Sequence, residues 1–189
     1  MQIEIKPLVI DRVEDFFEFF EHVAFAGHPE WGCDCFCCFF HSESRETWDK
    51  CTRESNKAAA RDFILTGRMH GLFAYAGSKP VGWCHYDRLQ NLPGAHVFYG
   101  DLASTDEDSG AIVCFTIAQG FRNQGIATKL LESAWADFKE QGVTRVEAYP
   151  VVNDDSQEHN YLGPLNLYKK LGFHIVRETE RHALVVKTL

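Results

Sequence analysis

Residues 119–131 constrain the fold of this chain most strongly, because they join two different apolar patterns. Residues 111–118, just before them, form a short apolar run rich in β-branched side chains, which predicts a buried strand. The apolar residues that follow recur at helical spacing: Ile126, Leu130, Leu131, Ala134, Trp135 and Phe138. The glycines between the two patterns therefore lie on a strand-to-helix turn. Free N–H groups and the positive end of the helix dipole favour a phosphate there.

Two common phosphate-binding loops do not match this turn. The Gly-x-Gly-x-x-Gly fingerprint of dinucleotide sites is absent. Gly120 and Gly125 have the spacing of a Walker loop, but Ile126 and Ala127 stand where its lysine and hydroxyl residue are needed. Mg–nucleotide chemistry is therefore not expected. A glycine-rich turn with ordinary capping is the alternative to a phosphate site.

Composition limits the classes of partner. The 189 residues carry a formal net charge of −8, with 45% hydrophobic and 24% charged residues, and no basic block is present. We therefore expect neither nucleic acid nor membrane as a partner, whereas an amine acceptor suits the acidic balance. No signal peptide and no apolar run of about 20 residues is visible, so we expect a cytoplasmic protein with reduced cysteines.

The remaining patterns predict alternating strands and helices. The first helix should be capped by Asp11 and run to about residue 25, with an aromatic face that is either core or the wall of a pocket. Residues 90–109 and 153–159 are expected to be polar loops. The other expected elements are a strand at 2–5, a helix at 52–68, a hairpin of 71–76 and 79–89, a helix ending near 142, a strand at 143–152, a short helix at 163–171 and a hairpin of 173–177 and 183–186.

Residues 27–41 are unusually rich in cysteine and aromatic side chains. Cys33, Cys35, Cys37 and Cys38 suggest zinc, but structural zinc sites pair such cysteines with a second, distant pair. We favour a reduced, aromatic lining of an acceptor pocket. Plain core and a metal site are the alternatives.

Two motifs carry a resemblance to a known family. Arg122-x-x-Gly125-x-Ala127, between strand and helix, resembles the acetyl-CoA pyrophosphate loop of the GNAT superfamily of N-acetyltransferases. The segment 166–173, in which Tyr168 precedes a Leu-Gly-Phe turn, matches a second segment of that family, in the right order. The cysteine-rich stretch and the segments 80–84 and 146–150 look like one bacterial GNAT group without an agreed substrate.

The resemblance implies an α/β (α+β) fold in a single N-acetyltransferase-like domain over residues 1–189. Its mixed, mostly antiparallel sheet would have about seven strands, flanked by about four helices. The sheet would splay between the two parallel central strands, at residues 111–118 and 143–152.

The same resemblance implies acetyl-CoA as the acetyl donor, with no metal. Its pantetheine would hydrogen-bond the backbone near Phe115, Thr116 and Ile117. Thr128 would add a hydroxyl group near the pyrophosphate. The pyrophosphate itself would rest on the N–H groups of Arg122, Asn123, Gln124, Gly125, Ile126 and Ala127.

The implied reaction is direct attack by a primary amine of a small molecule or peptide, through a tetrahedral intermediate. Tyr168 would protonate the departing thiolate. Glu147, a carboxylate in an apolar strand, is our favoured base, although it also fits an acceptor-binding or surface role. Other candidate bases are His85, Asp87 and His159.

Three points stay open at this stage. Cys114 could carry an acyl group, but the family precedent of direct transfer makes it a core residue. The alternatives to an enzyme are a non-catalytic acyl-CoA-binding or sensing module and a metal- or thiol-responsive protein that uses Cys33–Cys38. The acceptor is not identified, and a homodimer is possible.

Overall fold

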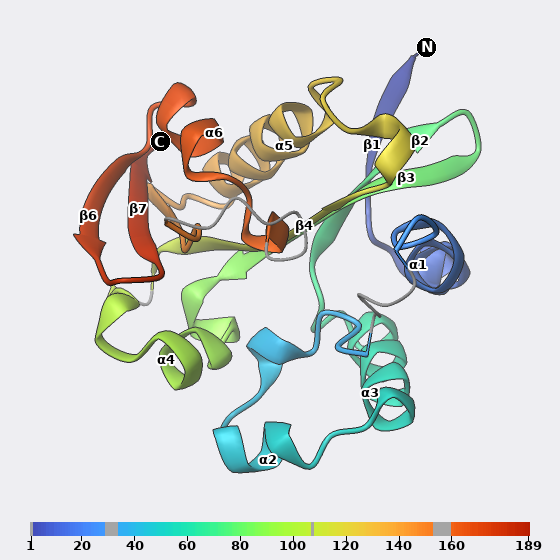
Figure 1. The fold of residues 1–189 in the computed structure, drawn as a ribbon, viewed down its shortest axis with the longest axis horizontal. Helices are drawn as coiled ribbons and strands as arrows, with labels where there is room; N and C mark the ends of the chain where they lie inside the picture. The colour runs from blue at the N-terminus through green and yellow to red at the C-terminus, as the bar shows by residue number, and fades with distance from the viewer. Residues whose placement is uncertain (1, 29–33, 107, 153–159) are drawn as a thin grey trace.

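The computed structural model describes residues 2–28, 34–106, 108–152 and 160–189, which form one seven-stranded sheet covered by helices (Figure 1). The strand order is β1-β2-β3-β4-β5-β7-β6. Every neighbouring pair is antiparallel except β4 and β5, which run parallel. The strands are β1 (Ile3–Pro7), β2 (Gly71–Ala76), β3 (Lys79–Arg88), β4 (Gly110–Ile117), β5 (Arg145–Ala148), β6 (His174–Glu178) and β7 (Ala183–Thr188).

The sheet opens between β4 and β5. Their ladder begins where Gly110 faces Val146, and it ends where Ile112 faces Ala148. Beyond this point β4 continues to Ile117, whereas β5 has already ended. The structure thus confirms the expected mixed sheet that splays at its parallel pair.

A bulge in β4 decides which side chains face which side of the sheet. Tyr86 of β3 faces Ile112, but the neighbouring His85 faces Cys114, so Val113 is an extra residue. An extra residue lets the residues after it change face. Phe115 consequently packs in the same cluster as Ile112, whereas Cys114 packs in a different one.

Helices cover both faces of the sheet. In Figure 1, α5 lies above the sheet and α2, α3 and α4 lie below it. The long α5 packs across β1, β2, β3 and β4. On the other face, the aromatic side of α1 packs on β3, where the rings of Phe16 and Trp83 meet edge to face at 5.3 Å. The helices are α1 (Val13–Glu18), α2 (Arg45–Asp49), α3 (Arg53–Leu65), α4 (Gly94–Tyr99), α5 (Ile126–Glu140) and α6 (Leu165–Lys170).

Most of the expected elements are present. The helix predicted at 52–68 is α3, which begins with a capping box between Thr52 and Ser55. The predicted hairpin of 71–76 and 79–89 corresponds to β2 and β3, and the long helix after the glycine turn is α5. The strand predicted at 143–152 is shorter: Arg145–Ala148 pairs with β7, and only Val146–Ala148 also pairs with β4. The loop predicted at 153–159 lies outside the described residues.

Two local predictions are wrong. Asp11 does not cap the first helix, because a 3-10 turn already begins at Ile10 and places Asp11 inside it. This turn leads into α1 and then into a wider π-helical turn, Phe19–Val23. Residues 90–109 are not simply a loop, since they contain α4.

Tertiary contacts explain α4. A Cβ atom on Gly94 would lie 2.6 Å from the backbone oxygen of Phe39, so the beginning of α4 packs directly on the backbone of Phe39. Phe98 of α4 stacks on the Phe39 ring at 3.7 Å. Packing of α4 against residues 39 and 40 outweighs its polar flanks.

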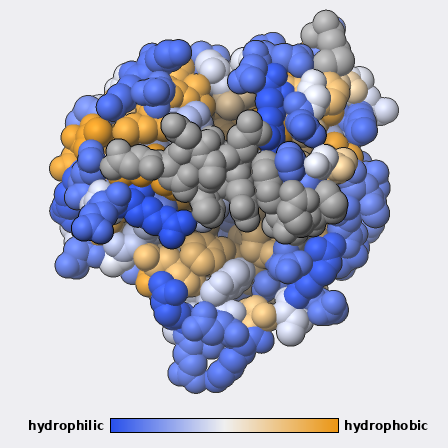
Figure 2. Space-filling view, in the orientation of Figure 1, coloured by the Kyte–Doolittle hydropathy of each residue, from blue (hydrophilic) through white to orange (hydrophobic). Residues whose placement is uncertain are grey.

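The surface agrees with the charged composition. In Figure 2 hydrophilic residues occupy most of the outline, and apolar areas are visible at the upper left and in the lower middle of this face. Of the helices in the described ranges, none has the length and apolar character needed to cross a lipid bilayer.

Candidate functional site

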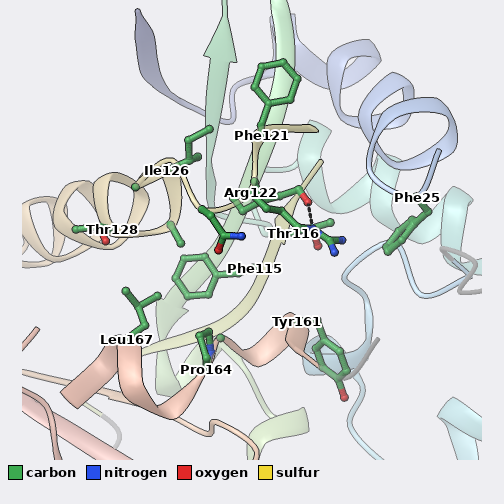
Figure 3. Close-up of a pocket in the computed structure, with 15 residues that line it drawn as sticks. Phe25, Phe115, Thr116, Phe121, Arg122, Ile126, Thr128, Tyr161, Pro164 and Leu167 are labelled. Carbon is green, nitrogen blue, oxygen red and sulfur yellow. Dashed lines mark hydrogen bonds between the residues drawn. The ribbon is translucent and has the colours of Figure 1, made fainter. Parts of the chain in front are cut away.

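A cavity of about 410 Å³ lies where the sheet opens. In Figure 3 it is enclosed by the end of β4, the beginning of α5, the beginning of α6 and the chain that follows α1. Its lining residues are Phe25, Phe115, Thr116, Ile117, Phe121, Arg122, Asn123, Gly125, Ile126, Ala127, Thr128, Tyr161, Gly163, Pro164 and Leu167. The predicted cofactor residues thus surround one cavity, with the exception of Gln124.

The beginning of α5 is open to an anion. Gly125 is the N-cap residue, with a left-handed φ of 77°, and no side chain in the described part of the chain caps it. The first helical hydrogen bond runs from the Lys129 N–H to the Gly125 carbonyl at 3.1 Å. The N–H groups of Ile126, Ala127 and Thr128 therefore have no carbonyl partner within the helix. A Cβ atom on Gly125 would have no neighbour within 4 Å, so a ligand can approach the backbone closely.

The loop before α5 is tied to the end of β4. Arg122 donates from Nε to the Ile117 carbonyl at 3.0 Å, the dashed line in Figure 3. Arg122 is also the only charged residue among the described lining residues. Gln124 points elsewhere, because its amide donates to the Gly120 carbonyl at 3.0 Å. The guanidinium group is therefore held at the end of β4, and Figure 3 draws it on the side of the cavity that faces Phe25.

The other end of the cavity is apolar. Phe25 and Tyr161 lie on one side of Figure 3, across from the first turn of α5. Phe121, Pro164 and Leu167 add further apolar surface. The sequence did not single out these five residues as pocket residues. The aromatic face of the first helix suggested a wall, but Phe25 lies beyond that helix, and no periodic pattern marks Tyr161.

Tyr168 lies behind the cavity wall and does not line it. Its side chain is fully buried, and its hydroxyl donates to the Leu162 carbonyl at 2.8 Å. Burial raises the pKa of the phenol well above its ordinary value, so it stays protonated. A Cβ atom on Gly163, which does line the cavity, would lie 3.1 Å from the Tyr168 hydroxyl.

Glu147 is fully buried in β5 and does not line the cavity. Its Oε1 accepts hydrogen bonds from the Tyr149 hydroxyl and, at 3.3 Å, from the Ser104 N–H. Its Oε2 accepts no hydrogen bond from the described residues, and Arg145 lies 4.0 Å from it. Burial raises the pKa of this carboxyl group, so it holds a proton more readily than an exposed glutamate.

The other candidate bases are also removed from the cavity lining. His85 is fully buried, and its ring stacks on that of His41 at 5.1 Å. Burial lowers the pKa of His85 well below its ordinary value, so the imidazole is neutral. Asp87 accepts from the backbone N–H of Arg88 and lies 2.7 Å from the ring of His70. His159 lies outside the described residues.

The described part of the cysteine-rich segment packs in the core. Phe36, Cys37 and Cys38 are buried, and the Trp83 indole donates to the Cys37 sulfur at 3.2 Å. None of the described residues at 34–41 lines the cavity, so the acceptor-pocket lining that we favoured is not seen there. Cys33 lies outside the described residues. Within the described ranges, no group of three histidine, cysteine or acidic side chains is placed to hold a metal.

Comparison with known proteins gives a family and a fold. The sequence model of the acetyltransferase (GNAT) family matches residues 33–173. The PaiA N-acetyltransferase of Thermoplasma acidophilum, solved with coenzyme A, superposes with a TM-score of 0.60 at 16% identity, covering 100% of both chains.

Two further solved structures have similar folds. The GNAT domain of PAT from S. lividans gives a TM-score of 0.62 at 16% identity, covering 99% of this chain and 90% of that one. An acetyltransferase of Thermus thermophilus gives 0.59 at 14% identity, covering 100% and 98%. A search of curated proteins found no match.

Proposed function

This chain belongs to the GNAT family of acetyltransferases, and we propose that it transfers an acetyl group from acetyl-CoA to a primary amine by direct attack. The observation that carries this proposal is one cavity that joins the beginning of α5, which no described side chain caps, to the end of β4 that β5 does not reach. Acetyl-CoA, the acetyl donor, supplies a diphosphate for the first feature and an extended amide chain with a thioester for the second.

At the phosphate end, the backbone of Gly125, Ile126 and Ala127 supplies N–H donors, and the helix dipole adds partial positive charge. Arg122, which also lines the cavity, adds a full positive charge at the end of β4. Gly125 is needed because its φ of 77° is strained for other residues, and because its open side admits the diphosphate. These features fit the donor without a metal ion.

Along β4, the backbone after Ile112 is no longer paired with β5. An unpaired strand edge can hydrogen-bond an extended chain that contains amide groups, as pantetheine does. Phe115, Thr116 and Ile117 therefore hold the thioester arm. A backbone N–H on this edge stabilises the negative charge that develops on the carbonyl oxygen.

Tyr168 is the proposed proton donor to the departing sulfur. The phenol carries its proton at neutral pH, as a donor must, although burial raises its pKa and so makes it a weaker acid than an exposed tyrosine. Its place directly behind Gly163 supports this role. The role requires the hydroxyl to turn away from the Leu162 carbonyl, to which it now donates.

Glu147 is the proposed base for the acceptor amine. Its raised pKa makes the carboxylate a better proton acceptor, and its Oε2 has no hydrogen-bond partner among the described residues. Because Glu147 does not line the cavity, it would act through water or after a movement of Tyr149. The apolar end, with Phe25 and Tyr161, favours an acceptor in which the amine adjoins an apolar group.

A non-catalytic acyl-CoA-binding module is the second candidate. Two observations favour it: the Tyr168 hydroxyl already has a partner, and Glu147 does not line the cavity. Such a module would bind the donor but would not turn it over.

Release of the CoA thiol, measured with a panel of small amines and peptides, separates the two candidates. Acetyl transfer predicts release that rises with one class of amine, together with an acetylated product identified by its mass. Saturable donor binding without amine-dependent release across a broad panel would favour the module.

A further inference from the structure

We propose that Arg145 and Asp106 are positioning residues for acetyl transfer: Asp106 draws the Arg145 guanidinium group away from Glu147, which stays able to take a proton from the acceptor amine. Arg145 and Glu147 belong to β5, and Asp106 lies in the segment that leads into β4. The proposal rests on the proposed function, because it takes Glu147 as the base. It assigns a task to two charged residues that do not line the cavity.

The guanidinium group of Arg145 lies between two carboxylate groups without a hydrogen bond to either. Its Nη1 is 3.8 Å from Oδ2 of Asp106, and its Nη2 is 4.0 Å from Oε2 of Glu147. Both distances exceed the range of an N–H···O hydrogen bond, but Coulomb attraction acts across them. One cation is thus shared by two anions, and each carboxylate weakens the hold of the guanidinium group on the other.

The two carboxylate groups differ in their access to water. The side chain of Glu147 is 0% exposed, whereas the side chains of Asp106 and Arg145 are 47% and 30% exposed. Water screens the charge on Asp106 but does not reach the charge on Glu147. When Glu147 takes up a proton, a buried negative charge is removed. The Arg145 charge that loses this partner still has Asp106 beside it.

The two oxygens of the Glu147 carboxyl group have different partners. Oε1 accepts hydrogen bonds from the Tyr149 hydroxyl and the Ser104 N–H. Oε2 has no hydrogen-bond partner among the described residues, and neither does the buried Nε of Arg145. A buried carboxylate oxygen without a partner disfavours the charged form. Oε2 is therefore the oxygen that takes the proton, and it is also the oxygen nearest to Arg145.

Hydrogen bonds hold Asp106 in place beside this group. Its Oδ2 accepts from the Ser109 hydroxyl at 3.0 Å, and its backbone N–H donates to the Ser104 hydroxyl at 3.1 Å. Ser104 in turn donates its own N–H to Glu147 at 3.3 Å. Serine and aspartate favour such local hydrogen bonds in turns. The segment that carries Asp106 is therefore anchored at Glu147 itself.

The other groups around Glu147 carry no charge. The residues opposite it in the sheet are apolar: Ala111 in β4 and Val186 in β7. From the helix side, Tyr99 of α4 stacks on the ring of Tyr149 at 4.7 Å. Burial raises the pKa of Glu147, and the hydrogen bond from Tyr149 and the charge of Arg145 oppose this effect. The position of the Arg145 charge is therefore a control on how readily Glu147 accepts a proton.

Carbon-13 NMR of protein labelled at the side-chain carboxyl group of glutamate tests the proposal without acetyl-CoA. The Glu147 resonance is the one that Glu147→Gln removes. Arg145→Gln removes the cation, so the midpoint of the Glu147 titration should move up by about 1 pH unit. Asp106→Asn removes the competing anion, so the midpoint should move down. This second change should be smaller, about half a pH unit, because Asp106 acts through Arg145 and is half-exposed.

Ser109→Ala is the matched control, because it removes a hydrogen bond to Asp106 but leaves all three charges in the chain. It should leave the titration of Glu147 as in the parent. Midpoints that move in the same direction in Arg145→Gln and Asp106→Asn, or in neither, would overturn the proposal. A change in Ser109→Ala as large as that in Asp106→Asn would also overturn it, because the fold of the segment would then be the cause. If one charge variant does not fold, the direction of change in the other still decides.

The pH dependence of kcat/KM separates this inference from the proposed function. If Glu147 is the base, the acid limb of the profile should follow the NMR midpoint, to higher pH in Arg145→Gln and to lower pH in Asp106→Asn. NMR midpoints that move while the acid limb stays would remove Glu147 as the base, and the positioning role with it. NMR midpoints that do not move would overturn the inference alone, whether or not the protein transfers acetyl groups.

Discussion

Replacement of Gly125 by aspartate should abolish most acetyl-CoA binding, whereas the same replacement at Gly142 should not. The two glycines flank α5, with φ angles of 77° and 75°, and a Cβ atom on either would have no neighbour within 4 Å. Both substitutions therefore impose a similar backbone cost, about 1–2 kcal/mol. Only Gly125 lines the cavity.

The binding loss follows from the charge. A carboxylate about 4 Å from one phosphate charge costs about 1 kcal/mol in bulk water and about 4 kcal/mol at an effective dielectric constant near 20. The dissociation constant of Gly125→Asp should therefore rise by roughly 5-fold to 1,000-fold. Both variants should lose similar thermal stability, about 2–8 °C.

Calorimetric titration of acetyl-CoA into the parent and both variants measures this difference. Gly142→Asp should bind within about twofold of the parent. Equal dissociation constants for the two variants would refute the placement of the diphosphate at the beginning of α5.

Three further outcomes can be measured on the same protein. Tyr168→Phe keeps the ring but removes the hydroxyl proton, so kcat should fall by about 100-fold with little change in the affinity for acetyl-CoA. If kcat is unchanged under conditions in which the chemical step limits the rate, Tyr168 is a packing residue. Glu147→Gln keeps the shape but removes the base, so kcat should fall by about 100-fold or more, whereas a loss of stability alone would indicate an anchor for Tyr149. Burial lowers the pKa of His41 from 6.5 to about 4. Between these two pH values the unfolded chain binds a proton at His41 that the folded chain does not, so the free energy of unfolding falls as the pH drops from 6.5 to about 4. In urea titrations, the loss of stability between about pH 7 and pH 5 should be smaller in His41→Phe than in the parent by about 2 kcal/mol; equal losses would contradict the burial argument.

Local pattern was sufficient for the elements that frame the cavity. The β-branched run before Gly120 predicted β4, and the helical spacing after Gly125 predicted α5. Both elements begin and end within a residue or two of the predicted bounds. Glycine at a position that needs positive φ is likewise a local requirement. The strand, turn and helix at this end of the cavity were therefore predictable from the sequence.

The opposite end of the site was not predictable, because distant contacts determine it. Phe25 and Tyr161 meet the cavity only after the chain has folded, and neither belongs to a periodic pattern. The same holds for α4, which depends on the contact of Phe98 with Phe39. Glu147 looked like a cleft residue on its strand, but its neighbours in the sheet bury it beneath Tyr149.

A crystal structure with acetyl-CoA bound tests the central claim most directly. The account predicts diphosphate oxygens within hydrogen-bonding distance, about 2.7–3.2 Å, of the N–H groups between Gly125 and Thr128. It also predicts that the thioester carbonyl lies against the edge of Phe115–Ile117 that faces away from β3. A diphosphate bound away from the beginning of α5, or a thioester outside the opening between β4 and β5, would contradict the account.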